Sequence, residues 1–185
     1  MVYKILITTS RRPSQRVRSF VKDLILVLPG AFRFTRGHSS YEDLAREAIH
    51  SGVTRVIIVS DMRGNPGIIR AYDVLVNPIG LKNIVSIIVS GVKLAREAGH
   101  STSAPIGVNV LAVLSDESSI AEEFTEAFIK AFYARVYHSS LAENSIVASI
   151  IGLGRDTVKV TFTYRGNPIG PILRLRRPHV MIKDD

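Results

Sequence analysis

Apolar residues in the first part of the chain follow two spacings, one typical of strands and the other of helices. The β-branched run at 4–9 predicts a buried strand. Apolar residues at helical spacing over 17–28 predict an amphipathic helix, with Pro13 in its first turn and an end before Gly30. The run VTRVIIVS at 53–60 predicts a strand buried on both faces, as in a sheet covered by helices. The order of these elements indicates an α/β fold.

Shorter patterns fill the intervals between these elements. Residues 31–35 predict a short edge strand, and Ser40 with Asp43 has the spacing of a capping box at the start of a second helix. The segments 68–76 and 84–94 predict two further strands.

A stretch of small and polar residues, GHSTSAP at 99–105, follows these strands. This composition is typical of a linker. We therefore expect one domain over 1–185, built from a basic N-terminal half (1–99) and a C-terminal half (106–185) that are joined by the linker 100–105.

The C-terminal half repeats the order of strand and helix. Residues 108–114 predict a strand, and Ser119 with Glu122 predicts a capping box near the start of a helix over 116–133. Three more strands are predicted at 146–151, 158–164 and 169–175. The alternation in the middle one places Lys159, Thr161 and Thr163 on the outward face.

One tetrapeptide occurs twice, as Arg63-Gly64-Asn65-Pro66 and as Arg165-Gly166-Asn167-Pro168. Gly, Asn and Pro favour turns, and each copy lies between two β-branched runs, so each copy predicts a hairpin turn. With the repeated strand and helix, the pair indicates an internal duplication into two related α/β halves.

Charge is distributed unevenly along the 185 residues. The net charge is +8, with 17 Arg and 7 Lys, but residues 1–40 alone carry +7 and residues 115–143 carry −4. This segregation favours one face that binds a polyanion and another that binds something else. The alternative is the solvated, arginine-rich surface of a thermophile protein. There is no Cys, which excludes disulfides, thiolate metal sites and cysteine nucleophiles.

The first apolar run is too short for a signal peptide or a membrane span, so we expect a cytoplasmic protein without a membrane partner. No P-loop, GxGxxG, GxSxG or HExxH motif occurs, and the five His are scattered. Asp61 ends a buried strand, where a catalytic carboxylate could lie, but Arg63 offers it a salt bridge. These observations predict no enzyme activity, no cofactor and no metal site.

The turn between the first strand and the first helix has the composition of an anion site. Thr8, Thr9 and Ser10 supply hydroxyl donors, and Arg12 and Arg16 follow them without an acid. Free amide groups and the dipole at a helix N-terminus would add to this attraction. The alternative is an ordinary strand-to-helix connection with solvated arginines.

The same stretch resembles a known family. The motif ILITTSRRPS at 5–14, with Phe20, Lys22 and Leu24, is similar to the opening motif of the Brix domain, and the Arg63-Gly64-Asn65-Pro66 turn resembles its second block. The resemblance extends over nearly the whole chain. It implies a duplicated α/β Brix domain whose halves are similar to the anticodon-binding domain of class II aminoacyl-tRNA synthetases. It also implies a short archaeal form of the Brix proteins of the small-subunit processome, which act in ribosome biogenesis and rRNA processing.

The chain departs from this pattern at one place. Eukaryotic members carry a Gly-Pro-Thr-Ala-Phe-like motif proposed to touch RNA, whereas this chain has Gly80-Leu81-Lys82-Asn83-Ile84. Only the glycine is kept, although Lys82 preserves a positive charge.

The first functional hypothesis is a non-catalytic ribosome assembly factor that grips pre-rRNA or rRNA through phosphates. The RNA-binding residues would be Ser10, Arg11, Arg12, Ser14, Arg16, Arg18, Lys22, Arg33, Arg36, Arg63, Lys82, Arg165, Arg174, Arg176 and Arg177. Few exposed aromatic residues accompany these charges, which favours backbone recognition over base stacking.

The second hypothesis is a protein-interaction scaffold. Its helix 116–133 would dock a basic ribosomal or assembly protein through Glu122, Glu123 and Glu126. A third hypothesis, an enzyme that holds a small phosphorylated substrate at 8–14, lacks a nearby base or nucleophile. The oligomeric state is left open.

Overall fold

A ten-stranded mixed sheet dominates the computed structural model, which describes residues 4–141 and 144–180, without the side chains of Leu141 and Arg177. The strands are β1 (Ile5–Thr9), β2 (Ala31–Arg33), β3 (Arg55–Met62), β4 (Asn65–Val76), β5 (Ile79–Lys93), β6 (Val110–Ser115), β7 (Arg135–Val136), β8 (Ser145–Gly152), β9 (Thr157–Tyr164) and β10 (Asn167–Val180). The helices are α1 (Gln15–Val27), α2 (Tyr41–His50), α3 (Ala95–Ala98) and α4 (Ser119–Phe132), with a 3-10 turn η1 (Ser139–Leu141).

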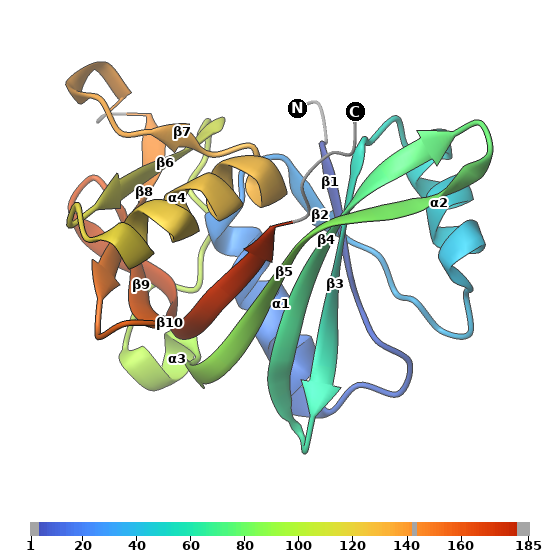
Figure 1. The fold of residues 1–185 in the computed structure, drawn as a ribbon, viewed down its shortest axis with the longest axis horizontal. Helices are drawn as coiled ribbons and strands as arrows, with labels where there is room; N and C mark the ends of the chain where they lie inside the picture. The colour runs from blue at the N-terminus through green and yellow to red at the C-terminus, as the bar shows by residue number, and fades with distance from the viewer. Residues whose placement is uncertain (1–3, 142–143, 181–185) are drawn as a thin grey trace.

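The sheet runs continuously across both parts of the chain. Its strand order is β2-β1-β3-β4-β5-β10-β9-β8-β6-β7, with β5 and β10 antiparallel at the centre (Figure 1). The mixed α/β fold expected from the sequence is thus confirmed, and β2 lies at an edge as predicted.

Two apolar cores lie on opposite faces of the sheet. Ile5 and Ile7 point into the larger core, which also takes the buried faces of α1 and α4. Leu6, between them in β1, points into the smaller core under α2. Because successive strand residues face opposite sides, β1 and β3 are covered on both faces, as the run at 53–60 predicts.

The helix starts agree only in part with the sequence. The capping box of Ser40 and Asp43 is present in full. Pro13, however, precedes the N-cap Ser14, so it lies before the first turn of α1 and not within it. The box expected from Ser119 and Glu122 is wrong, because Ser118 is the N-cap of α4 and its hydroxyl donates to Asp116 Oδ1 at 2.6 Å.

The two Arg-Gly-Asn-Pro copies form hairpin turns, as predicted. In each turn Arg and Gly are the two loop residues, with φ of 52° and 82° at Arg63 and Gly64 and of 49° and 78° at Arg165 and Gly166. Positive φ at both loop residues is the requirement of a type I′ hairpin. The first turn joins β3 to β4, whereas the second joins β9 to the central strand β10. Counted from the nearest edge of the sheet, the first turn joins the third and fourth strands, whereas the second turn joins the fourth and fifth. The two copies of the tetrapeptide therefore do not occupy corresponding positions, and the prediction that they mark a duplication is wrong.

The linker predicted at 100–105 is bound to the sheet at one point. Ser101 forms a bridge with Ile169, and its carbonyl accepts from the Gly170 amide at 3.2 Å. The division into two halves at this segment stays a prediction.

Candidate nucleic-acid interface

The turn at 10–14 is tied to the Arg63-Gly64 hairpin by hydrogen bonds that centre on Asp61. The Ser14 amide donates to Asp61 Oδ2 at 2.8 Å, and the Gly64 amide donates to Oδ1 at 2.8 Å. The Ser14 hydroxyl donates to the Gly64 carbonyl at 2.9 Å, while the Ser10 hydroxyl accepts from the Asp61 amide at 3.2 Å. Two segments about 50 positions apart in the chain therefore meet at the start of α1.

This arrangement corrects two expectations. The Asp61 carboxylate lies where the sequence predicted a phosphate, and hydrogen bonds from Ser14 and then from Gly64 lower its pKa. Asp61 thus takes backbone donors instead of the predicted salt bridge with Arg63. Thr8 and Thr9 are buried, so their hydroxyls are not available to an external anion. The Ser14 hydroxyl already donates to the Gly64 carbonyl, whereas the Ser10 hydroxyl accepts from the Asp61 amide, and the RNA-binding role of both stays a prediction.

Three arginines remain exposed around this tie: Arg11, Arg12 and Arg63. We call these three residues the basic corner. Arg12 has a φ of 53°, an unfavourable left-handed conformation for a residue with a side chain. Arg11 lies toward the start of α2, since Asp43, whose pKa is lowered mainly by hydrogen bonds from Ser40, is also influenced by Arg11. Because the Asp61 carboxylate accepts hydrogen bonds from the backbone amides of Ser14 and Gly64, the turn does not need these three arginines as donors, and their side chains are exposed.

More cations extend from the basic corner. Arg18 and Lys22 are exposed one turn apart on α1, and no acid lies in the first turn of this helix. Arg33 is exposed at the end of the edge strand β2. Like charges at i and i+4 destabilise a helix slightly, so this arrangement has a cost that an anion would offset.

Two of the predicted RNA-binding arginines are engaged within the protein. Arg16 forms a two-pronged ion pair with Glu97 and donates to the Val92 carbonyl at 3.0 Å, which fastens α1 to β5 and α3. Arg36 is only 8% exposed, donates to the carbonyls of Ser39 and Thr9, and lies 5.0 Å from the Tyr41 ring centroid. Both guanidinium groups thus have internal partners in the free protein, and their role as RNA ligands stays a prediction.

The remaining predicted cations are spread over other parts of the sheet. Lys82 is exposed on β5 opposite Asp73, and Arg165 is exposed beside the ring of Tyr164. Arg174 is exposed on β10, while Arg176 pairs with Asp156 at 3.1 Å. The side chain of Arg177 lies outside the described residues. The structure thus does not bring the predicted set into a single cluster.

The acidic residues of α4 lie on its outer side. Glu122 and Glu126 are exposed, Glu126 pairs with Lys130 at 2.7 Å, and Glu123 is half-buried. The negative surface expected from the sequence is present, and its role in binding a partner stays a prediction.

Other site types find no support in residues 4–141 and 144–180. No group of three or more His, Asp or Glu lies close enough to hold a metal ion there. In the same residues, no helix combines the length and the apolar composition needed to cross a membrane.

Comparison with known proteins places these features in a family. No family model matches the chain. A probable Brix domain-containing ribosomal biogenesis protein from Aeropyrum pernix is 52% identical over 176 residues, which cover 95% of this chain and 97% of the relative. A crystal structure of a probable ribosomal biogenesis protein from the same organism matches 98% of this chain and 99% of its own, with a TM-score of 0.90 and 51% identity.

Two further similarities point the same way. The crystal structure of Mil, an archaeal Imp4-like protein, has a TM-score of 0.70 and 25% identity over 96% of this chain and 99% of its own. The U3 small nucleolar ribonucleoprotein protein IMP4 of Bos taurus is 46% identical over 63 residues, which are 34% of this chain and 22% of that protein. The relative from Aeropyrum pernix is similar enough over nearly its full length to decide the assignment: the chain belongs to the family of Brix domain-containing ribosomal biogenesis proteins.

Proposed function

We propose that this protein is a non-catalytic assembly factor of the small ribosomal subunit that binds pre-rRNA in the cytoplasm, mainly through phosphates. The observation that carries the proposal is the basic corner. Arg11 and Arg12 come from the turn before α1 and Arg63 from the β3–β4 hairpin; all three lie around a turn whose backbone is already satisfied, and remain exposed. Arg18, Lys22 and Arg33 extend the same surface.

The chemistry of this surface suits a phosphate backbone. Guanidinium groups bind phosphate oxygens with two parallel hydrogen bonds, and most protein contacts to nucleic acids go to phosphate and sugar. The printed names of the relatives support a role in ribosome assembly, and IMP4 is named as a component of a ribonucleoprotein. Lys82 and Arg165 stay predictions outside this surface.

A salt titration tests the proposal. We expect the affinity of the full chain for a pre-rRNA fragment to fall with salt at a log–log slope of about −4 if about six phosphates are contacted, and neutralising Arg11 and Arg12 to Gln to reduce the slope by about 1.4. The control, Arg46→Gln with Arg135→Gln, removes the same charge from α2 and β7. Absence of binding at micromolar protein, or an affinity insensitive to salt, contradicts the proposal.

The exposed acids of α4 favour a second function, a scaffold that docks a basic assembly or ribosomal protein. Glu122→Lys with Glu126→Lys reverses this charge at exposed positions. We expect the variant to lose a basic partner that the wild type retains after nuclease treatment of a native lysate. Partners that nuclease removes from both proteins are bridged by RNA and contradict this second function.

We further infer that the fold arose by internal duplication, each half being related to the anticodon-binding domain of class II aminoacyl-tRNA synthetases. The strand order supports this, since β2-β1-β3-β4-β5 and β7-β6-β8-β9-β10 list corresponding strands from each edge to the centre. A different repeat, Asn-Pro-Ile-Gly at 77–80 and 167–170, lies at the starts of the two central strands. Superposition of 5–93 on 110–180 tests the duplication.

A further inference from the structure

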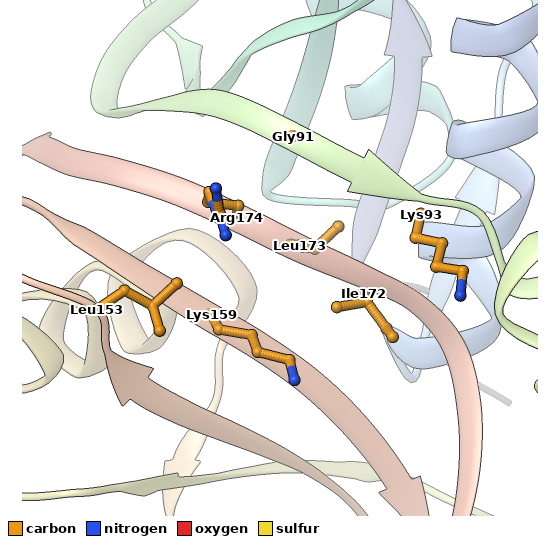
Figure 2. Close-up of a pocket in the computed structure, with 7 residues that line it drawn as sticks. All are labelled: Gly91, Lys93, Leu153, Lys159, Ile172, Leu173 and Arg174. Atoms are coloured by element: carbon orange, nitrogen blue, oxygen red, sulfur yellow. The ribbon is translucent and has the colours of Figure 1, made fainter.

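A second basic surface lies on the open face of the sheet, away from α1 and α4. Arg174 on β10 is directly opposite Lys159 on β9, and both side chains are exposed. Lys93 on β5 is opposite Ile172 on β10 and is also exposed. Figure 2 shows the side chains of Lys93 and Lys159 on either side of Ile172.

These three cations have no acidic partner within 4–141 and 144–180. Like charges directly opposite each other on neighbouring strands are destabilising. The Arg174–Lys159 pair therefore costs stability in the free protein. A polyanion bound across the pair would remove this repulsion and gain two charge-assisted contacts.

The surface is also hollowed along a line that crosses several strands. A hollow of about 430 Å³ is lined by Gly91, Lys93, Lys159 and Arg174, with Leu153 and Ile172 as walls. A second hollow of about 520 Å³ shares Leu153 and Arg174 with it and reaches Thr157 and Arg176. A third, of about 350 Å³, shares Gly91 and reaches Met62 and Asn65 beside the Arg63 turn.

Together the three hollows form what we call the sheet groove. It crosses β4, β5, β10 and β9, which at about 4.8 Å between neighbouring strands is about 14 Å. One end adjoins the hairpin that carries Arg63 of the basic corner. Gly91 opens the middle, because its place opposite Arg174 holds no side chain.

We propose that the sheet groove binds a single-stranded RNA segment that continues from the basic corner, with phosphates on Lys93, Lys159 and Arg174. This inference rests on the proposed function and adds a path to it. Single-stranded RNA is favoured over a duplex because the groove extends only about 14 Å across four strands. The contacts are backbone contacts, since the residues lining the three hollows include no aromatic side chain for base stacking.

Two variants test the sheet groove separately from the basic corner. Lys159→Gln with Arg174→Gln removes the opposed cations, and thermal unfolding should show an unchanged or higher melting temperature because the repulsion is lost. Gly91→Asp places an acid opposite Arg174, where it would pair with the guanidinium and fill the groove without disturbing the fold.

The probe is a labelled oligouridylate of about twelve nucleotides, within the range that single-strand binding folds accommodate. We expect each groove variant of the full chain to raise the Kd about tenfold, and the double neutralisation to reduce the salt slope by about 1.4. The charge-matched control Arg46→Gln with Arg135→Gln should leave both values nearly unchanged.

The outcomes separate this inference from the proposed function. If Arg11→Gln with Arg12→Gln weakens binding and the groove variants do not, the groove inference is overturned and the proposed function stands. If wild type binds no RNA, both fail. If RNA affinity is unaffected but the groove variants abolish binding of an acidic peptide such as oligoglutamate, the groove is a protein site and the inference is wrong.

Discussion

The starts of α1 and α4 are each held by one carboxylate, but the residues around them carry opposite charge. At α1, the Asp61 carboxylate from the end of β3 accepts from the amides of Ser14 and Gly64. At α4, the carboxylate of Asp116 belongs to the turn itself and accepts from Ser118 and from the Gly152 amide at the end of β8. In both cases one carboxylate joins a strand-to-helix turn to the end of a neighbouring strand.

The residues around these two carboxylates differ in sign. Arg11 and Arg12 flank the first tie, whereas Glu117 lies beside the second. Arg12 and Glu117 also share a left-handed backbone, with φ of 53° and 63°. The backbone geometry is therefore compatible with either charge, and the arginines at the first turn are not needed to build it. Their charge is free to serve binding.

The largest expected effect concerns the contact between the central strand β10 and the first helix α1. A Cβ atom at Gly170 of β10 would lie 2.3 Å from Cγ1 of Val27 in α1, and Gly170 has a φ of 65°. Gly170→Ala should lower the free energy of unfolding by about 3 kcal/mol, measured by denaturant titration.

Gly166→Ala provides the matched control for this substitution. Gly166 also has a positive φ, 78°, but nothing lies within 4 Å of its Cβ position, so only backbone strain of about 1 kcal/mol is expected. Val27→Ala should partly rescue Gly170→Ala. Equal losses at Gly166 and Gly170 would show that the contact between β10 and α1 is unimportant.

The next effect compares the two carboxylates. Asp61→Asn should cost about 1.5 kcal/mol, since a charged acceptor of two backbone amides is replaced by an amide that matches only one. Asp116→Asn should lower the melting temperature less, because that carboxylate is more exposed. A larger loss at Asp116 would reverse this ranking.

The pH dependence of stability tests whether the ionised Asp61 carboxylate is the cause of the loss in Asp61→Asn. Hydrogen bonds from Ser14 and Gly64 lower the pKa of Asp61 in the folded protein. Its contribution is therefore complete above the unfolded pKa of about 3.9 and is lost as the pH falls toward the lower folded value. Asp61→Asn should flatten the loss of stability in acid, and an unchanged acid profile would contradict the assignment.

A smaller effect is expected at the two hairpin turns. Arg63 and Arg165 have the same backbone conformation, and Asn suits that position in a type I′ turn. Arg63→Asn should weaken RNA binding about threefold through loss of one phosphate contact, whereas Arg165→Asn should not. The two variants should have similar melting temperatures. Equal losses of affinity would extend the RNA surface to the β9–β10 turn.

The smallest effect is expected when charge is added to the second helix start. Glu117→Arg with Glu122→Arg gives α4 the sign of α1 at exposed positions. If location decides binding, RNA affinity should change by less than about twofold, measured by fluorescence anisotropy. A gain of tenfold would show that net charge alone governs the affinity.

Local patterns were enough to predict much of the fold. The β-branched run of β3, the helical spacing of α1 and the Ser40 capping box each depend on residues that are close in sequence, and all three are confirmed. The number and order of strands in the sheet could not be obtained in this way. Strand order depends on pairings such as Lys93 with Ile172, which no local pattern encodes.

The candidate site shows the same limit. Exposure of Arg11, Arg12 and Lys22 follows from their positions near a turn and on the polar side of a helix. The internal partners of Arg16 and Arg36 lie elsewhere, and the pairing of Arg16 with Glu97 spans 81 positions. The sequence does not predict that Lys93 and Lys159 belong to one site, because they come near each other only through the pairing of β5 and β9 with β10. The outward alternation of 158–164 was the one available signal.

The position of β10 at the centre of the sheet has a consequence for synthesis on the ribosome. The strand β10 lies between β5 and β9, and its Gly170 lies against Val27 of α1. Until residues 167–180 have emerged, β5 keeps an unpaired edge and α1 lacks part of its apolar cover. The strands on either side of β10 therefore cannot complete their pairing until this late segment of the chain is available.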